Sequence, residues 1–138
     1  MRRTDSYRRQ HDDLLQVAGE ISGKLDTHSL SQNASEVRTL LSKLLGKLNV
    51  HLAAEDKALY PRLLNAGNPE AKSLAERYIS EMGNIADVVK SYSQKWPSPA
   101  AIQKDPATFV AETKNLFGAL SKRIHRENNE LYNYVDKM

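Results

Sequence analysis

The stretch that decides the fold runs from residue 34 to residue 65 and reads ASEVRTLLSKLLGKLNVHLAAEDKALYPRLLN. Its apolar residues return at steps of three and four, which is the period of an amphipathic α-helix. Asn33 followed by Glu36 resembles a capping box at its start, and Gly67 closes it. The inward stripe consists of Val37, Leu41, Leu44, Leu48, His51, Glu55, Leu59 and Leu63.

Three further stretches show the same helical period. The first runs from about Thr4 to Asp26. Another runs from Asn68 to Trp96 and opens with an N-cap residue and a proline in the first turn. The last runs from about Pro106 to Val135, after a short helical turn over Ser98 to Lys104. No segment alternates with a period of two, so the sequence predicts no sheet.

Four helices of this length with short connections favour an all-α fold, an antiparallel up-down-up-down four-helix bundle. The chain has 138 residues, of which 40% are hydrophobic and 27% charged, and this is the composition of an ordinary soluble protein. We therefore expect one domain spanning residues 1–138, because this length supports a single core.

The composition also excludes several kinds of site and partner. There is no cysteine, which excludes disulfides, thiolate zinc sites and iron–sulfur clusters, and leaves four histidines with carboxylates as the strong metal ligands. The net charge is only +3, and the basic residues are interspersed with 17 acidic ones along most of the chain. We therefore expect no nucleic-acid partner. No apolar run is long enough to span a membrane and no secretory signal is evident, so we expect a cytoplasmic protein without a membrane partner.

Polar residues on the core stripes are the informative feature, because a buried polar group must be paired. The strong ones are His11, His51, Glu55 and Glu127. His51 and Glu55 lie one helical turn apart on the same face, where they can hold one ion or bond each other. In an up-down-up-down bundle all four residues can lie at the same level along the bundle axis. They would then line one polar cavity, with Met82 facing it.

A short repeat relates the second and fourth helices. Glu55 and Glu127 each begin the pattern Glu-x-x-x-Leu-Tyr, which ends at Tyr60 and Tyr132. The two helices therefore resemble pseudo-symmetric copies in this turn. In the fourth helix Arg123 stands where the second has a histidine.

His125 lies near the same turn but points away from the core. At 100° per residue it is about 200° from Glu127, so we expect it on the surface. A pairing of His125 with Glu130 as metal ligands is an alternative that requires a rotated or bulged helix. His28 falls in the first connection, where we expect a solvated residue.

Three motifs together point to a known family. They are Gln10-His11-Asp12, His51-Leu-Ala-Ala-Glu55-Asp56 followed by Leu59-Tyr60-Pro61, and Arg123-Ile124 followed by Glu127 and Leu131-Tyr132. Over essentially the whole chain these resemble the hemerythrin-like domain, also called the HHE cation-binding domain. The resemblance implies a four-helix bundle that binds non-heme iron, usually as a di-iron centre bridged by two carboxylates. Family roles include dioxygen binding, oxygen or redox sensing, and repair of damaged iron centres.

The resemblance also implies roles for particular residues. His11, His51, Glu55 and Glu127 match metal ligands of the family. Met82 and Arg123 stand where the family has histidines on its third and fourth helices, which leaves a reduced ligand set for one or two iron ions. A thioether is a poor ligand beside oxygen donors, so Met82 is expected to fill space. Tyr60 and Tyr132 stand at positions that resemble the family pattern, and we expect them to pack and hydrogen-bond near the carboxylates.

Two functions follow from these observations. The first is a non-heme iron-binding protein, with dioxygen or another small ligand at the iron, that serves oxygen or redox sensing or iron handling. The alternative is a metal-free regulatory or interaction module, in which the polar residues form a buried hydrogen-bonded cluster with Arg123 as counter-ion. An oxygenase-like di-iron enzyme would need Glu-x-x-His on two helices, and the chain has none, so we expect no enzyme.

Overall fold

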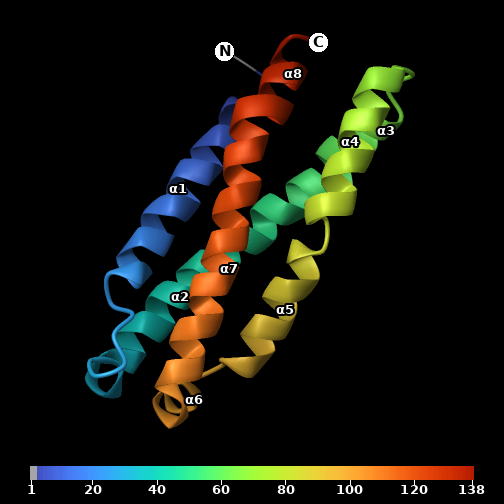
Figure 1. Cartoon of the computed structure of the whole chain (residues 1–138). Helices are drawn as coiled ribbons and strands as arrows, with labels where there is room; N and C mark the ends of the chain where they lie inside the picture. The colour runs from blue at the N-terminus through green and yellow to red at the C-terminus, as the bar shows by residue number, and fades with distance from the viewer. Residues whose placement is uncertain (1–2) are drawn as a thin grey trace.

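The computed structural model describes residues 3–138, and these residues form a bundle of helices without any strand (Figure 1). The predicted all-α four-helix bundle is confirmed. The helices are α1 (Asp5–Ser22), α2 (Leu30–Ala54), η1 (Glu55–Leu59), α3 (Tyr60–Leu64), α4 (Pro69–Met82), α5 (Ile85–Lys95), α6 (Pro99–Lys104), α7 (Pro106–Arg126), η2 (Glu127–Leu131) and α8 (Tyr132–Asp136).

Several of these elements join into longer helices. The second long helix consists of α2, η1 and α3, and the fourth consists of α7, η2 and α8, where η1 and η2 are single wide turns of π-helix. In Figure 1 both chain ends lie at one end of the bundle, while the α1–α2 connection and α6 lie at the other. Asp136 ties the two ends together, because its carboxylate accepts hydrogen bonds from the Thr4 backbone and hydroxyl and from Arg8.

The first connection differs from the prediction. Helix α1 ends at Ser22 rather than near Asp26, and α2 begins at Leu30, before the predicted start at Ala34. The predicted capping box at Asn33 is therefore wrong. The Asp26 carboxylate organises the connection instead, since it accepts from the His28 backbone N–H and the Ser29 hydroxyl. Leu30 is fully buried, which favours an earlier start for the helix.

The third helix is broken, although its pattern predicts one helix from Asn68 to Trp96. Helix α4 ends at Met82 and α5 starts at Ile85. At Gly83 a Cβ atom would lie 2.5 Å from the Ile79 carbonyl oxygen, so the tight approach requires glycine. The break leaves the Met82 carbonyl oxygen available, and it accepts a hydrogen bond from Arg123.

The core consists of two apolar clusters. The larger is built from α1, α2, α5, α6 and α7, and includes Leu14, Leu48 and Phe109. The smaller lies around α3, α4 and α8, and includes Tyr78 and Leu131. Five buried polar residues belong to neither cluster and lie between them along the helices: His11, His51, Glu55, Arg123 and Glu127. This arrangement surrounds a polar layer with apolar packing on both sides.

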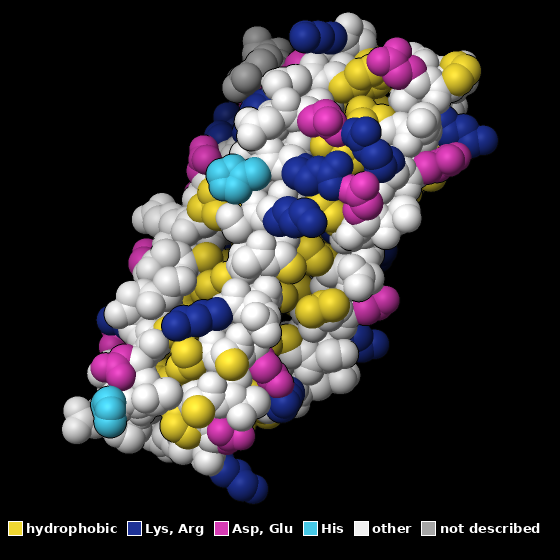
Figure 2. Space-filling model, viewed as in Figure 1, with side chains coloured by type: hydrophobic (Ala, Val, Ile, Leu, Met, Phe, Trp, Pro, Cys, Tyr) yellow, Lys and Arg dark blue, Asp and Glu magenta, His cyan; other side chains and the backbone are white. Residues whose placement is uncertain are grey.

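The surface above this layer carries paired charges. Figure 2 shows basic and acidic side chains close together over the upper half of the face seen in Figure 1. Ion pairs between Arg77 and Glu130 and between Arg126 and Glu81 join α4 to the fourth long helix here. No helix in residues 3–138 combines the length and the apolar character needed to cross a membrane.

Candidate metal centre

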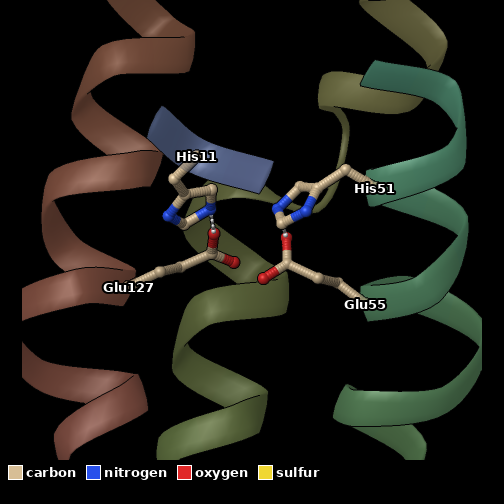
Figure 3. Close-up of side chains that lie close together, drawn as sticks. All are labelled: His11, His51, Glu55 and Glu127. Atoms are coloured by element: carbon tan, nitrogen blue, oxygen red, sulfur yellow. Dashed lines mark ion pairs between the residues drawn. The ribbon is translucent and has the colours of Figure 1, made fainter. Parts of the chain in front are cut away.

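The structure brings together the four polar residues of the core stripes (Figure 3). His11 comes from α1 and His51 from α2, while Glu55 and Glu127 are the first residues of the two π-turns. Each side chain is at most 2% exposed. One donor atom from each residue lies within 4.8 Å of the donor atoms of the other three. This compact, sealed group is the geometry that a single metal ion needs.

The π-turns explain how the repeated Glu-x-x-x-Leu-Tyr pattern works. The backbone N–H of Tyr60 donates to the carbonyl of Glu55, and that of Tyr132 donates to the carbonyl of Glu127. In an α-helix, residues five positions apart would point about 140° away from each other. The wider turn reduces this angle, so each glutamate and its tyrosine both face the centre.

Each tyrosine holds the glutamate of the other long helix. The Tyr60 hydroxyl donates to Glu127 Oε2 at 2.6 Å, and the Tyr132 hydroxyl donates to Glu55 Oε2 at 2.5 Å. Burial, together with the charges of the two glutamates, raises the pKa of both phenols above their ordinary value. Both hydroxyls therefore keep their protons and fix one oxygen of each carboxylate.

Two amide side chains orient the histidines. Gln10 Oε1 lies 2.6 Å from His51 Nδ1, and Asn128 Oδ1 lies 2.8 Å from His11 Nδ1. An amide oxygen can only accept, so Nδ1 of each ring carries a proton and Nε2 is directed to the carboxylates. No role was predicted for Gln10 or Asn128, since neither lies on an apolar stripe. Their position in the sequence could have indicated a role, because Gln10 directly precedes His11 and Asn128 directly follows Glu127.

Two of the four atoms that face one another at the centre lack a hydrogen-bond partner. His11 Nε2 lies 3.1 Å from Glu127 Oε1, and His51 Nε2 lies 3.0 Å from Glu55 Oε1. Among the described residues, His51 Nε2 and Glu127 Oε1 are buried without a hydrogen-bond partner. Such unpaired buried atoms are rare, and they are imidazole nitrogen and carboxylate oxygen, which transition metals bind. The residues therefore fit a metal ion.

Burial sets the protonation of the histidines. It lowers the pKa of His51 to about 4, and the nearby His11 contributes to the same shift, so the His51 ring is neutral. Burial also acts to lower the pKa of His11, but the nearby Glu127 carboxylate and the Asn128 amide outweigh it, and the pKa rises. Burial and the charge of Glu55 raise the pKa of Glu127.

Arg123 lies inside the same layer and is only 2% exposed. Its Nε donates to Glu127 Oε2 at 3.2 Å, and its Nη2 donates to Glu55 Oε1 at 3.2 Å and to Asp56 Oδ1 at 3.0 Å. Its Nη1 donates to the Met82 carbonyl at 3.3 Å. Met82 thus contributes its backbone to this layer, while its side chain packs in the smaller apolar cluster.

The alternative ligands lie elsewhere. His125 is exposed on α7. Glu130 is half exposed and pairs with Arg77 and with the Tyr78 hydroxyl. The structure therefore does not bring His125 or Glu130 into the cluster, because the π-turn that begins at Glu127 directs Glu130 toward α4. His28 is also exposed, in the first connection.

Comparison with known proteins complements this geometry. Residues 2–135 match the family described as the hemerythrin HHE cation binding domain. No curated protein and no solved structure shows significant similarity to the chain.

Proposed function

The chain belongs to the hemerythrin HHE cation-binding family, and from this premise we propose that it binds non-heme iron through His11, His51, Glu55 and Glu127. The observation that carries the proposal is the buried pair of unpartnered atoms, His51 Nε2 and Glu127 Oε1. Leaving such atoms without partners costs free energy, and a bound cation removes that cost.

The chemistry of the donors supports iron as the ion. Two imidazoles and two carboxylates suit divalent iron, and no thiolate is present to favour softer metals. When bound, iron supplies a coordination position for dioxygen or another small ligand and a change of oxidation state. The protein contributes ligand orientation through Gln10 and Asn128, and the apolar clusters exclude water. We propose oxygen or redox sensing, or iron handling, rather than catalysis.

One surface cleft of the described chain lies near the centre. A cleft of about 220 Å³ is lined by Asp56, Tyr60, Pro61, Leu64, Ile79 and Gly83. Asp56 contacts Arg123 and Tyr60 contacts Glu127, so the cleft ends one residue away from the cluster.

The metal-free module remains the second candidate, and Arg123 favours it. The guanidinium pairs with both glutamates, so the layer already contains a cation when no metal is bound. In that case the protein would act through its surface.

Metal analysis separates the two functions. The protein is loaded with ferrous iron without oxygen, desalted and analysed beside a His51→Ala, Glu55→Ala variant and a His125→Ala control. Iron binding predicts near-stoichiometric iron in the parent and the control, and its loss in the double variant. A folded parent that retains no iron would refute this function and favour the module. A change in visible absorption on admitting dioxygen tests the sensing role.

A further inference from the structure

We propose that Arg123 is a built-in counter-cation that fills one of two equivalent cation positions at the Glu55–Glu127 pair, so that the centre takes one divalent ion per chain. This inference rests on the proposed function, since it concerns the number of ions. It is carried by the contacts of the guanidinium, by the internal repeat and by the charges of the layer.

All three nitrogens of the Arg123 guanidinium are engaged in hydrogen bonds. Each of its three nitrogens donates to an oxygen, and together they bind Glu55, Glu127, Asp56 and the Met82 carbonyl. The Tyr60 ring covers the group at 5.6 Å. The oxygens that could hold a second ion are therefore already bound to a charge that does not dissociate.

The internal repeat identifies this position as equivalent to the histidine side. Arg123 precedes Glu127 by four residues, as His51 precedes Glu55, and a π-turn follows each glutamate. His51 Nε2 and Arg123 Nη2 both contact Glu55 Oε1, at 3.0 and 3.2 Å. Glu127 presents Oε1 to His11 and Oε2 to Arg123. Each carboxylate thus contacts one histidine and the guanidinium.

The formal charges balance for one ion. Glu55, Glu127 and Asp56 supply three negative charges around the layer, while Arg123 and one divalent ion supply three positive charges. A second divalent ion would leave two uncompensated positive charges in a buried site, which is strongly unfavourable. The carboxylate oxygens that would bind this second ion would also have to give up their hydrogen bonds to the guanidinium.

The test uses Mn²⁺, which keeps its oxidation state and is visible by electron paramagnetic resonance. Equilibrium dialysis of the metal-free full chain should give one Mn²⁺ per chain, with the signal of an isolated ion. Arg123→His should bind two ions whose signals are coupled, because the variant completes a second histidine–glutamate pair. Lys122→His places a histidine on the neighbouring exposed position, and it should bind one ion as the parent does.

A second variant keeps the proposal testable if Arg123→His does not fold. Arg123→Gln removes the charge and keeps a hydrogen-bonding side chain, so the single ion should bind about tenfold more tightly or better. Two ions in the parent, one ion in folded Arg123→His, or weaker binding by folded Arg123→Gln would each overturn the role of Arg123 and leave metal binding intact. Absence of Mn²⁺ from the parent and from all variants would instead refute metal binding itself.

Discussion

Tyr132 donates its hydroxyl proton to Glu55 across the bundle, from the fourth long helix to the second, at 2.5 Å. Tyr60 and Glu127 form the reverse contact. The two bonds cross between the same helices and lie directly after the same type of π-turn. They lock both carboxylates before any ion arrives, so the centre is organised by hydroxyl groups as well as by its ligands.

Tyr132→Phe should lower the free energy of unfolding by about 1–3 kcal/mol, because a buried carboxylate oxygen loses its donor. Denaturant unfolding of the metal-free protein measures this. Tyr134→Phe is the matched control, since among the described residues the Tyr134 hydroxyl takes part in one exposed hydrogen bond, from Asn68, and the variant should stay within about 0.5 kcal/mol of the parent. Equal effects of the two substitutions would contradict a special role for the crossed bonds.

Gln10→Leu should weaken Mn²⁺ binding by about 10–100-fold while the helix content is retained, because His51 loses the acceptor that fixes its ring. Equilibrium dialysis and circular dichroism measure the two quantities. Gln16→Leu, at an exposed position of the same helix, should bind Mn²⁺ as the parent does. Unchanged affinity in Gln10→Leu would show that packing alone orients His51.

Gly83→Ala should destabilise the protein by about 1–3 kcal/mol, since the new Cβ would lie 2.5 Å from the Ile79 carbonyl oxygen and the backbone must shift. Gly118→Ala is the contrasting change. That glycine lies within α7, and beyond the backbone of its own helix turns no atom lies within 4 Å of an added Cβ, so alanine should stabilise the helix by about 0.5–1 kcal/mol. Thermal unfolding of both variants should give shifts of opposite sign.

Asp136→Asn should destabilise the protein at neutral pH by about 1–2 kcal/mol, because the carboxylate binds Thr4 and Arg8 at the chain ends. Burial alone would raise the pKa of Asp136, but these bonds outweigh it and lower the pKa below its ordinary value of 3.8. The contribution is therefore complete above that value and is lost as the pH falls through the lowered pKa.

The pH dependence of Asp136→Asn gives a second readout. Unfolding at pH 7 should distinguish the variant from the parent, and the difference should shrink steadily below pH 4 as the parent carboxyl becomes protonated. Asp12→Asn, at an exposed position of α1, serves as the control. A difference that stays constant down to pH 2 would mean that the clamp does not depend on the charge of Asp136.

Some of the site could be predicted because it depends on helix phase. His11, His51, Glu55 and Glu127 each lie on an apolar stripe, and the direction of a side chain around a helix is set by its local spacing. The same phase placed His125 on the outside. The repeated Glu-x-x-x-Leu-Tyr pattern likewise marked two equivalent turns before their shape was known.

Other parts could not be predicted because they depend on residues distant in sequence. Gln10 and Asn128 lie beside the stripes, and their partners are histidines 41 and 117 positions away. The break at Gly83 interrupts a continuous apolar pattern for a steric reason that periodicity does not contain. Helix α2 begins earlier than predicted because the Asp26 carboxylate accepts a hydrogen bond from the backbone of the connection.

The sequence by itself therefore determined the four helices, the four inward polar residues and the absence of thiolate chemistry, since periodicity and composition are local properties. The tertiary structure alone decided how these groups are used. It placed Arg123 against Glu55, Glu127 and Asp56 at once. It also brought each tyrosine to the glutamate of the other long helix. Such contacts follow from the packing of helices against each other, which the phase of a single helix does not specify.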